Sequence, residues 1–205
     1  VEFSVRGTPR DKEQMKADFM KLSAEQEMDI SFQEESMYRR MRRLICFDMD
    51  STWIETEVID ELAIRAGVGD QVKAITEAAM RGEIDFCESF RQRCALLKGL
   101  DVSVMQEIAE NLPITERVDR LMRILKKVGF KIAILSGGFT YFGNYLKQKY
   151  NIVYVYANEL EVENGKLTGR HVGDIVDGKR KAELLRLIAQ VENAVSYTHL
   201  TLPTN

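Results

Sequence analysis

The sequence predicts an α/β fold whose core is a parallel β-sheet, and three observations lead to this prediction. Short apolar runs at residues 44–47, 131–135 and 152–157 have the length and composition of buried strands. The longer segments between these runs carry apolar residues at helical spacing. Strands that alternate with helices along a chain are typical of a parallel sheet covered by helices.

The first 43 residues predict a small separate module followed by a linker. Residues 1–6 alternate like a strand, residues 11–25 have apolar side chains at helical spacing, and residues 29–33 alternate again. This strand–helix–strand order over residues 1–33 resembles part of an ACT-like α/β regulatory module. Residues 34–43 are polar and end in four arginines, which in an acidic chain favours a solvated linker over an anion-binding patch.

Residues 44–194 predict one α/β domain that contains a helical insertion. The insertion, about residues 55–112, directly follows the first strand and carries three apolar stripes at helical spacing, so we expect a helical cap over a site. Beyond the insertion the expected elements are helix 115–128, strand 131–135, helix 140–150, strand 152–157, a hairpin around Asn164-Gly165 and helix 179–191.

The composition narrows the class of protein. The chain is 45% hydrophobic and 30% charged, which is typical of a globular protein with a substantial core. Its formal net charge of −3 does not favour nucleic acid or an anionic membrane as a partner, and no apolar run is long enough to span a bilayer. The three cysteines, Cys46, Cys87 and Cys94, form no metal-spaced cluster and no even disulfide set, so we expect a reducing cytoplasm.

Both ends of the chain lead us to expect a fragment of a longer protein. Val1 is not an initiator residue and stands in an alternating, strand-like run. Residues 195–205 contain no Asp, Glu, Lys or Arg and look like the in-frame translation of a transposon-type sequencing adapter, so we exclude them from the fold. On this interpretation the natural sequence stops near Ala194 and the chain as written is inactive; the alternative is a natural polar tail.

Polar side chains follow the first two predicted strands of the domain. Asp48 and Asp50 come directly after the first strand, and because side chains repeat every second residue both carboxylates point to the same side. Ser136 and Gly137 follow the second strand and offer a phosphate a hydroxyl and an unhindered backbone amide. The carboxyl ends of parallel strands are where ligands bind, so we expect a site there. Ordinary Asp/Ser-rich and glycine turns are the structural alternatives.

The order of these motifs resembles that of the haloacid dehalogenase superfamily, and further segments are similar to its phosphoserine phosphatase family. The resemblance covers about residues 43–193 and implies a Rossmann-like parallel core with a cap. The matching segments are D-M-D-S-T at residues 48–52, Glu57, residues 76–86, Arg93, S-G-G-F at residues 136–139, A-N-E-L at residues 157–160 and Lys181 in the last helix. A Gly-Asp-Gly loop that carries a further metal-binding aspartate in the family has no match in this chain.

The resemblance implies a catalytic role for both aspartates. Asp48 is expected to attack the phosphorus and form an aspartyl-phosphate, while Asp50 acts as general acid and then as general base. Ser136, Gly137 and Lys181 are expected to hold the phosphate oxygens. The expected cofactor is Mg²⁺, held by Asp48 and Asp50 together with the unmatched aspartate.

The resemblance also implies a substrate, O-phosphoserine, whose hydrolysis to serine and phosphate is the last step of serine biosynthesis. Glu57 is expected to hold the substrate amine and Arg93 its carboxylate, while Met80 and Phe86 shield the site when the cap closes. Alternatively, Glu57 and Arg93 are solvated charges on helices.

Two other functions remain open on the sequence. One is another small-molecule phosphatase of the same superfamily, and the other is a non-catalytic fragment that binds an amino acid. Two partner hypotheses accompany the main one: an amino-acid effector at residues 1–33, and a second copy of the chain in a homodimer.

Overall fold

The structure is a computed structural model that describes residues 5, 7, 11–30, 44–192 and 194. Two compact units divide the chain, residues 1–40 and residues 41–205. The predicted strands 1–6 and 29–33 lie mostly outside the described residues. The linker 34–43 and the tail 195–205 lie wholly outside them.

The described part of the first unit is one helix, α1 (Lys12–Gln26). It begins at Asp11, whose carboxylate accepts hydrogen bonds from the backbone N–H groups of Glu13 and Gln14 at 2.8 and 3.0 Å. It ends at Glu27, which adopts a left-handed conformation, and none of its residues is buried. The helix predicted at residues 11–25 is therefore present.

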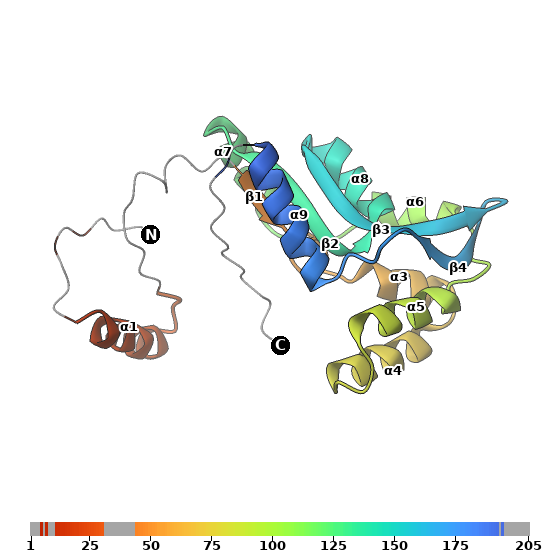
Figure 1. Cartoon of the computed structure of the whole chain (residues 1–205), viewed down its shortest axis with the longest axis horizontal. Helices are drawn as coiled ribbons and strands as arrows, with labels where there is room; N and C mark the ends of the chain where they lie inside the picture. Colours follow the sequence, from red (N-terminus) through yellow and green to blue (C-terminus); the bar gives the residue numbers. More distant parts are fainter. Residues whose placement is uncertain (1–4, 6, 8–10, 31–43, 193, 195–205) are drawn as a thin grey trace. The chain divides into compact units, whose positions relative to one another are not determined.

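The second unit contains a four-stranded sheet in the order β1-β2-β3-β4 (Figure 1). β1 pairs with β2 and β2 with β3 in parallel, whereas β3 and β4 are antiparallel. The sheet is mixed rather than wholly parallel because Asn164 and Gly165, both at positive φ, close a tight hairpin whose strands return antiparallel. The strands are β1 (Leu44–Phe47), β2 (Lys131–Phe139), β3 (Tyr154–Glu163) and β4 (Lys166–Val172).

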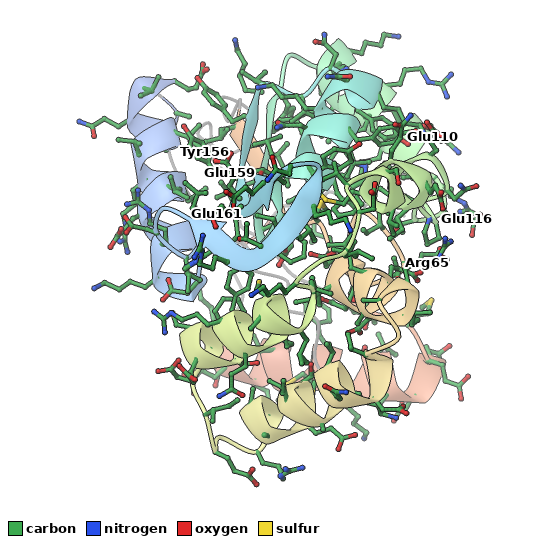
Figure 2. The ribbon with its side chains drawn as sticks, turned by 90° about the vertical axis from the view of Figure 1, so that its right-hand side faces the viewer. Arg65, Glu110, Glu116, Tyr156, Glu159 and Glu161 are labelled. Atoms are coloured by element: carbon green, nitrogen blue, oxygen red, sulfur yellow. The ribbon has the colours of Figure 1, made fainter. Side chains whose placement is uncertain are left out.

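Two strands are longer than the sequence predicted. β2 continues through Ser136 and Gly137 to Phe139, where we expected a turn, and its pairing with β3 shifts register between Leu135 and Phe139. β3 runs without a break through the segment where we expected two strands, and Figure 2 shows Tyr156, Glu159 and Glu161 following one another along it. Both extensions form because each strand has a partner at its far end, which local patterns do not reveal.

Helices cover both faces of the sheet. Ile132 and Ile134 of β2 share one core cluster with Phe142 and Leu146 of α8. The alternate residues of β2 lie in a second cluster with α9, because successive side chains point to opposite faces. α7 (Val118–Lys127) and α8 (Thr140–Tyr150) belong to the first cluster, and α9 (Gly178–Val191) covers the opposite face.

Helices also fill the predicted insertion after β1. They bury apolar stripes such as Val58, Ile59, Leu62 and Ala63, and Figure 1 shows α3, α4 and α5 grouped together. Arg65 at the end of α3, labelled in Figure 2, pairs with Glu107 of α6 at 3.1 Å. The four helices are α3 (Val58–Arg65), α4 (Gly69–Met80), α5 (Phe86–Leu96) and α6 (Ser103–Glu110).

Gly169 of β4 lies directly against the C-terminal end of α5. A Cβ atom at Gly169 would lie 3.0 Å from Cβ of Lys98 and 3.1 Å from the carbonyl oxygen of Ala95, and the φ angle of Gly169 is +82°. Only glycine combines this backbone conformation with so close an approach. The hairpin of β3 and β4 thus supports α5, the helix that carries Phe86 and Arg93.

We predict that Gly169→Ala lowers the free energy of unfolding by roughly 2–4 kcal/mol, because backbone strain and overpacking add. The matched control is Gly165→Ala, which also has a positive φ of +76° but no atom within 4 Å of the added Cβ. It loses only the strain component, about 1 kcal/mol. Urea denaturation of both variants measures the difference, and equal losses would show that α5 does not press on Gly169.

Candidate active site

Asp48 follows the last residue of β1 and meets Lys181 from the other end of the domain. Oδ2 of Asp48 accepts a hydrogen bond from Nζ of Lys181 at 2.6 Å, and Oδ1 accepts the backbone N–H of Met49 at 2.8 Å. Lys181 reaches this position from the first turns of α9, which begins at Asp177, whose side chain accepts the N–H of Arg180 at 2.7 Å. The structure therefore places a cation on the carboxylate that the sequence identifies as the candidate nucleophile.

Asp50 is held by two donors in a more buried setting. Its Oδ1 accepts the backbone N–H of Val58 at 3.1 Å, and its Oδ2 accepts the hydroxyl of Ser136 at 3.3 Å. Burial raises the pKa of Asp50 to about 7, with Glu57 and Asp48 adding to the rise and the two hydrogen bonds opposing it. A carboxyl group with this pKa carries a proton in part at neutral pH, which suits a general acid.

Gly138 belongs to the site, although the predicted site residues did not include it. A Cβ atom at this position would lie 2.2 Å from Oδ2 of Asp50 and 2.8 Å from Cε of Met49. The backbone N–H of Gly138 instead donates to Oγ of Ser136 at 2.9 Å, and Ser136 is fully buried. The double glycine after the second strand was the available sequence signal, since it allows this close approach to the carboxylate.

Phe86 lies over Gly137 near the C-terminal end of β2, whereas no described contact places Met80 there. A Cβ atom on Gly137 would lie 3.1 Å from Cζ of Phe86, so the ring covers the glycine even though the residue is 42% exposed. Met80 ends α4 and is 75% exposed, and no described contact brings it to the carboxylates. The structure thus brings one of the two expected shielding residues to the site.

Glu57 and Arg93 lie near each other on the helical side of the site. Oε1 of Glu57 accepts the hydroxyl of Ser51 at 2.8 Å, and burial raises the pKa of Glu57. Burial lowers the pKa of the Arg93 guanidinium, and the charges of Asp60, Glu57 and Asp50 oppose that shift. Asp60 stands one turn after Glu57 on α3 and was not predicted, because an acidic residue in a first helical turn is ordinary.

The oxygen donors at the strand ends suit a hard divalent cation. Mg²⁺ commonly binds to one or two carboxylates and completes its shell with waters and substrate phosphate oxygens. The residues described here contain no cluster of three or more His, Cys, Asp or Glu that could hold a metal. Asp48 and Asp50 offer the hard oxygen donors that Mg²⁺ prefers, so these two residues would hold it beside a phosphate.

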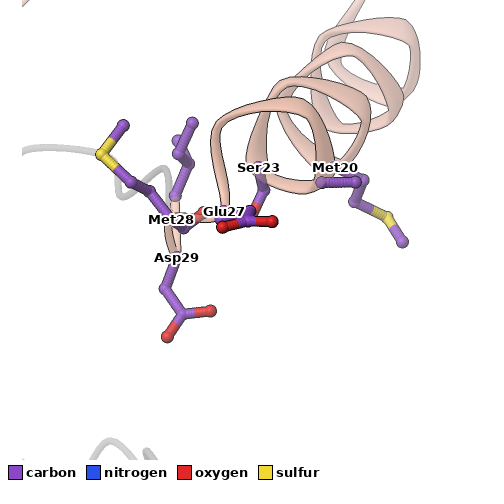
Figure 3. Close-up of a pocket in the computed structure, with 7 residues that line it drawn as sticks. Met20, Ser23, Glu27, Met28 and Asp29 are labelled. Carbon is purple, nitrogen blue, oxygen red and sulfur yellow. Dashed lines mark hydrogen bonds between the residues drawn. The ribbon is translucent and has the colours of Figure 1, made fainter.

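Two open hollows elsewhere contain none of the predicted site residues. One, of about 450 Å³, surrounds the end of α1 and is lined by residues that include Met20, Ser23 and Met28 (Figure 3). The other, of about 270 Å³, lies between Lys98 and the β3–β4 hairpin. Neither hollow gathers the combination of carboxylates and phosphate-binding donors that surrounds Asp48.

The described residues include no helix long and apolar enough to cross a membrane. Their three cysteines are free, with Cys94 buried and Cys46 and Cys87 partly so.

The sequence model of the haloacid dehalogenase-like hydrolases matches residues 42–194, and the chain belongs to this family. Relatives within it point to a narrower group. The chain is 46% identical over 192 residues to a phosphoserine phosphatase of Archaeoglobus fulgidus, covering 94% of this chain and 56% of that protein. It is 45% identical over 175 residues to the phosphoserine phosphatase of Haemophilus influenzae, covering 85% and 56%. The chain thus spans about half the length of these relatives.

Solved structures agree in fold. A phosphoserine phosphatase determined as a phospho-aspartyl intermediate analogue has a TM-score of 0.70 and 39% identity, covering 75% of this chain and 74% of that one. A haloacid dehalogenase family hydrolase of Salmonella enterica has a TM-score of 0.82 and 29% identity, covering 91% and 63%. The α/β class and the family resemblance inferred from the sequence are confirmed.

We predict that Gly138→Ala lowers kcat by roughly 100-fold, because the added methyl displaces the Asp50 carboxylate by an ångström or more. Gly178→Ala is the matched control, since Cβ at that position meets no atom within 4 Å. Steady-state kinetics on any phosphomonoester substrate that the chain hydrolyses measures the effect. A Gly138→Ala variant with the same kcat as the unmodified chain would contradict the close packing of Gly138 on Asp50.

We predict that the stability of the chain falls as pH rises from about 4 to about 7, and that Asp50→Asn removes part of this fall. The folded pKa of Asp50 is raised to about 7 from an ordinary value of 3.8, so in this window the native state binds the proton more tightly than the unfolded chain. The slope for one such group approaches 1.4 kcal/mol per pH unit. Urea denaturation at several pH values, with EDTA present, checks it; an unchanged slope in the variant would assign the dependence to other groups.

Proposed function

We propose that this chain carries the catalytic part of a phosphoserine phosphatase, which hydrolyses O-phosphoserine to serine and phosphate in the last step of serine biosynthesis. The observation that carries the proposal is the convergence of Asp48, Asp50, Ser136 and Lys181 at the carboxyl ends of two parallel strands. Relatives named phosphoserine phosphatase, at 45–46% identity, support the substrate.

In the first half of the proposed reaction, a carboxylate oxygen of Asp48 forms a bond to phosphorus as the bond from phosphorus to the serine oxygen breaks. Asp50 gives its proton to that serine oxygen, a role supported by its pKa of about 7. The products are free serine and a phosphorylated Asp48.

In the second half, a water oxygen forms a bond to the phosphorus as the bond from phosphorus to the Asp48 oxygen breaks, and Asp50 takes up a proton from the water. Phosphate is released, and the Asp48 carboxylate and the protonated Asp50 are restored. Lys181 has three N–H donors, so it can contact Asp48 and a phosphate oxygen together. The hydroxyl of Ser136 and the backbone amide of Gly137 complete the cradle for the remaining oxygens. Phosphoryl transfer depends chiefly on such positioning and electrostatic stabilisation.

Mg²⁺ is the proposed cofactor, and the carboxylate of Asp48 and the backbone carbonyl of Asp50 would hold it together with the further aspartate of the family's Gly-Asp-Gly loop, which has no match in this chain. When bound, it would offset the repulsion between the Asp48 carboxylate and the phosphate dianion.

The cap helices supply the proposed specificity. Glu57 would hold the substrate amine and Arg93 its carboxylate, a pairing supported by their burial and mutual proximity. Phe86 would shield the phosphate from above Gly137. Met80 would help to shield the phosphate only if α4 moves towards the sheet when the cap closes.

Other parts of the proposal concern partners and location. An amino-acid effector would bind at the first 33 residues, treated as an ACT-like module, and the whole protein would form a homodimer. A cytoplasmic location is supported by the three free cysteines.

The deciding experiment compares two substrates, O-phosphoserine and p-nitrophenyl phosphate, in the presence of Mg²⁺. We expect Asp48→Asn to abolish turnover of both, because the amide is not a nucleophile. We expect Arg93→Ala to raise KM for O-phosphoserine by about 10–100-fold, the worth of a hydrogen bond to a charged group. Turnover of p-nitrophenyl phosphate, which lacks the carboxylate, should stay unchanged.

Arg91→Ala is the matched control for Arg93. It lies on the same helix, is exposed and pairs with Glu88 at 3.7 Å, so both activities should persist. Equal losses on both substrates in Arg93→Ala would remove the specificity role of Arg93. Turnover of p-nitrophenyl phosphate without preference for O-phosphoserine would indicate another small-molecule phosphatase, and serine binding without any turnover would indicate a non-catalytic fragment.

A further inference from the structure

Asn158 of β3 is a buried amide that contacts two segments of the candidate active site. The residue is 2% exposed. Its side-chain nitrogen donates to the carbonyl oxygen of Gly137 at 2.7 Å and, more weakly, to that of Gly138 at 3.3 Å. Its side-chain oxygen accepts the backbone N–H of Val176 at 2.8 Å. Both polar ends of the amide are thus occupied, and each holds a different segment: the C-terminal end of β2 and the segment that precedes α9.

The first segment, the C-terminal end of β2, connects Asn158 to Asp50. A peptide group is planar, with its C=O and N–H pointing in opposite directions. Because Asn158 holds the carbonyl of Gly137, the N–H of the same peptide, which belongs to Gly138, points to Oγ of Ser136 at 2.9 Å. With its oxygen thus engaged, Ser136 donates its own hydroxyl to Asp50 at 3.3 Å. A continuous series of hydrogen bonds joins Asn158 to the candidate general acid.

The second segment, which precedes α9, connects Asn158 to Asp48. Val176, held by Asn158, directly precedes Asp177, the residue that caps α9. The backbone N–H of Lys181 donates to the carbonyl oxygen of Asp177 at 2.8 Å, so the cap fixes the turn from which Lys181 extends. Nζ of Lys181 then donates to Asp48 at 2.6 Å. The start of α9 is therefore tied to β3 at the point where its lysine is set.

We propose that Asn158 is a positioning residue that holds Asp50 and Lys181 in register with each other. The role rests on the proposed phosphatase function, since it concerns the same site. The side-chain hydrogen bonds of Asn158 go to backbone atoms of Gly137, Gly138 and Val176 rather than to Asp48, Asp50 or Lys181. It would act by fixing the end of β2 and the segment before α9 on β3, so that Asp50 and Lys181 keep a constant separation.

Two variants test separately the contact of Asn158 with the end of β2 and its contact with the segment before α9. Asn158→Asp keeps the oxygen that accepts from Val176 but replaces the nitrogen that donates to Gly137. We expect amide hydrogen exchange of Gly138, followed by NMR, to accelerate by about 10-fold, the worth of one net hydrogen bond, while that of Val176 changes little. Asn158→Leu, which introduces no buried charge, should accelerate exchange at both amides and keeps the test available if the aspartate variant does not fold.

The matched control is Thr140→Val. The hydroxyl of Thr140 donates to the backbone carbonyl of Asn158 at 3.2 Å. This variant therefore removes a hydrogen bond at the same residue and leaves the side-chain bonds of Asn158 to Gly137 and Val176 in place. We expect it to leave the exchange of Gly138 and Val176 unchanged relative to the rest of the sheet. In kinetics, Asn158→Leu should lower kcat for O-phosphoserine by roughly 100-fold with KM changed less than about 3-fold, because misplaced groups affect the chemical step.

The outcomes distinguish this proposal from the proposed function. If the unmodified chain does not hydrolyse O-phosphoserine but exchange changes selectively at Gly138 and Val176, the phosphatase assignment fails, while the hydrogen-bonded connection from Asn158 to both segments is upheld. Uniform acceleration across the sheet in the Asn158 variants, or an unchanged kcat in a folded variant of an active chain, would overturn the positioning role.

Discussion

The parallel pairing of β1 with β2 is the constraint on which the site depends. The register places Phe47, the last residue of β1, opposite Ile134 of β2. Asp48 and Asp50 follow β1, and Ser136 lies two residues beyond Ile134 on β2, which allows the bond between Ser136 and Asp50 across 86 residues of sequence. A shift by one residue would turn alternate side chains to the opposite face and separate these groups.

Local environment gives the two carboxylates different properties. Asp48 is next to a lysine and keeps a charged partner, whereas Asp50 is removed from water and receives only an amide and a hydroxyl. Burial therefore raises the pKa of Asp50 and favours its protonated form. The same sheet edge can in this way present the proposed nucleophile and the proposed proton donor within two residues of the chain.

The layers around the sheet carry the remaining groups to this edge. The hairpin of β3 and β4 supports α5 through Gly169, and α5 brings Phe86 over Gly137. β3 also supplies Asn158, which contacts both the end of β2 and the segment before α9. Glycine at position 138 is required because the end of β2 passes within contact distance of Asp50. Central strand, cap helix and last helix thus converge on one small volume.

The sequence by itself determined the α/β class, the helical insertion, the tight turn at Asn164-Gly165 and the family, since each of these depends on local periodicity or on a short motif. It also identified Asp48 and Lys181, but only as separate residues. Tertiary structure decided that they touch, that β3 extends past its predicted end, and that Gly138 and Asn158 belong with the site. Strand partners, desolvation and close approach arise between segments far apart in sequence, and no local pattern encodes them.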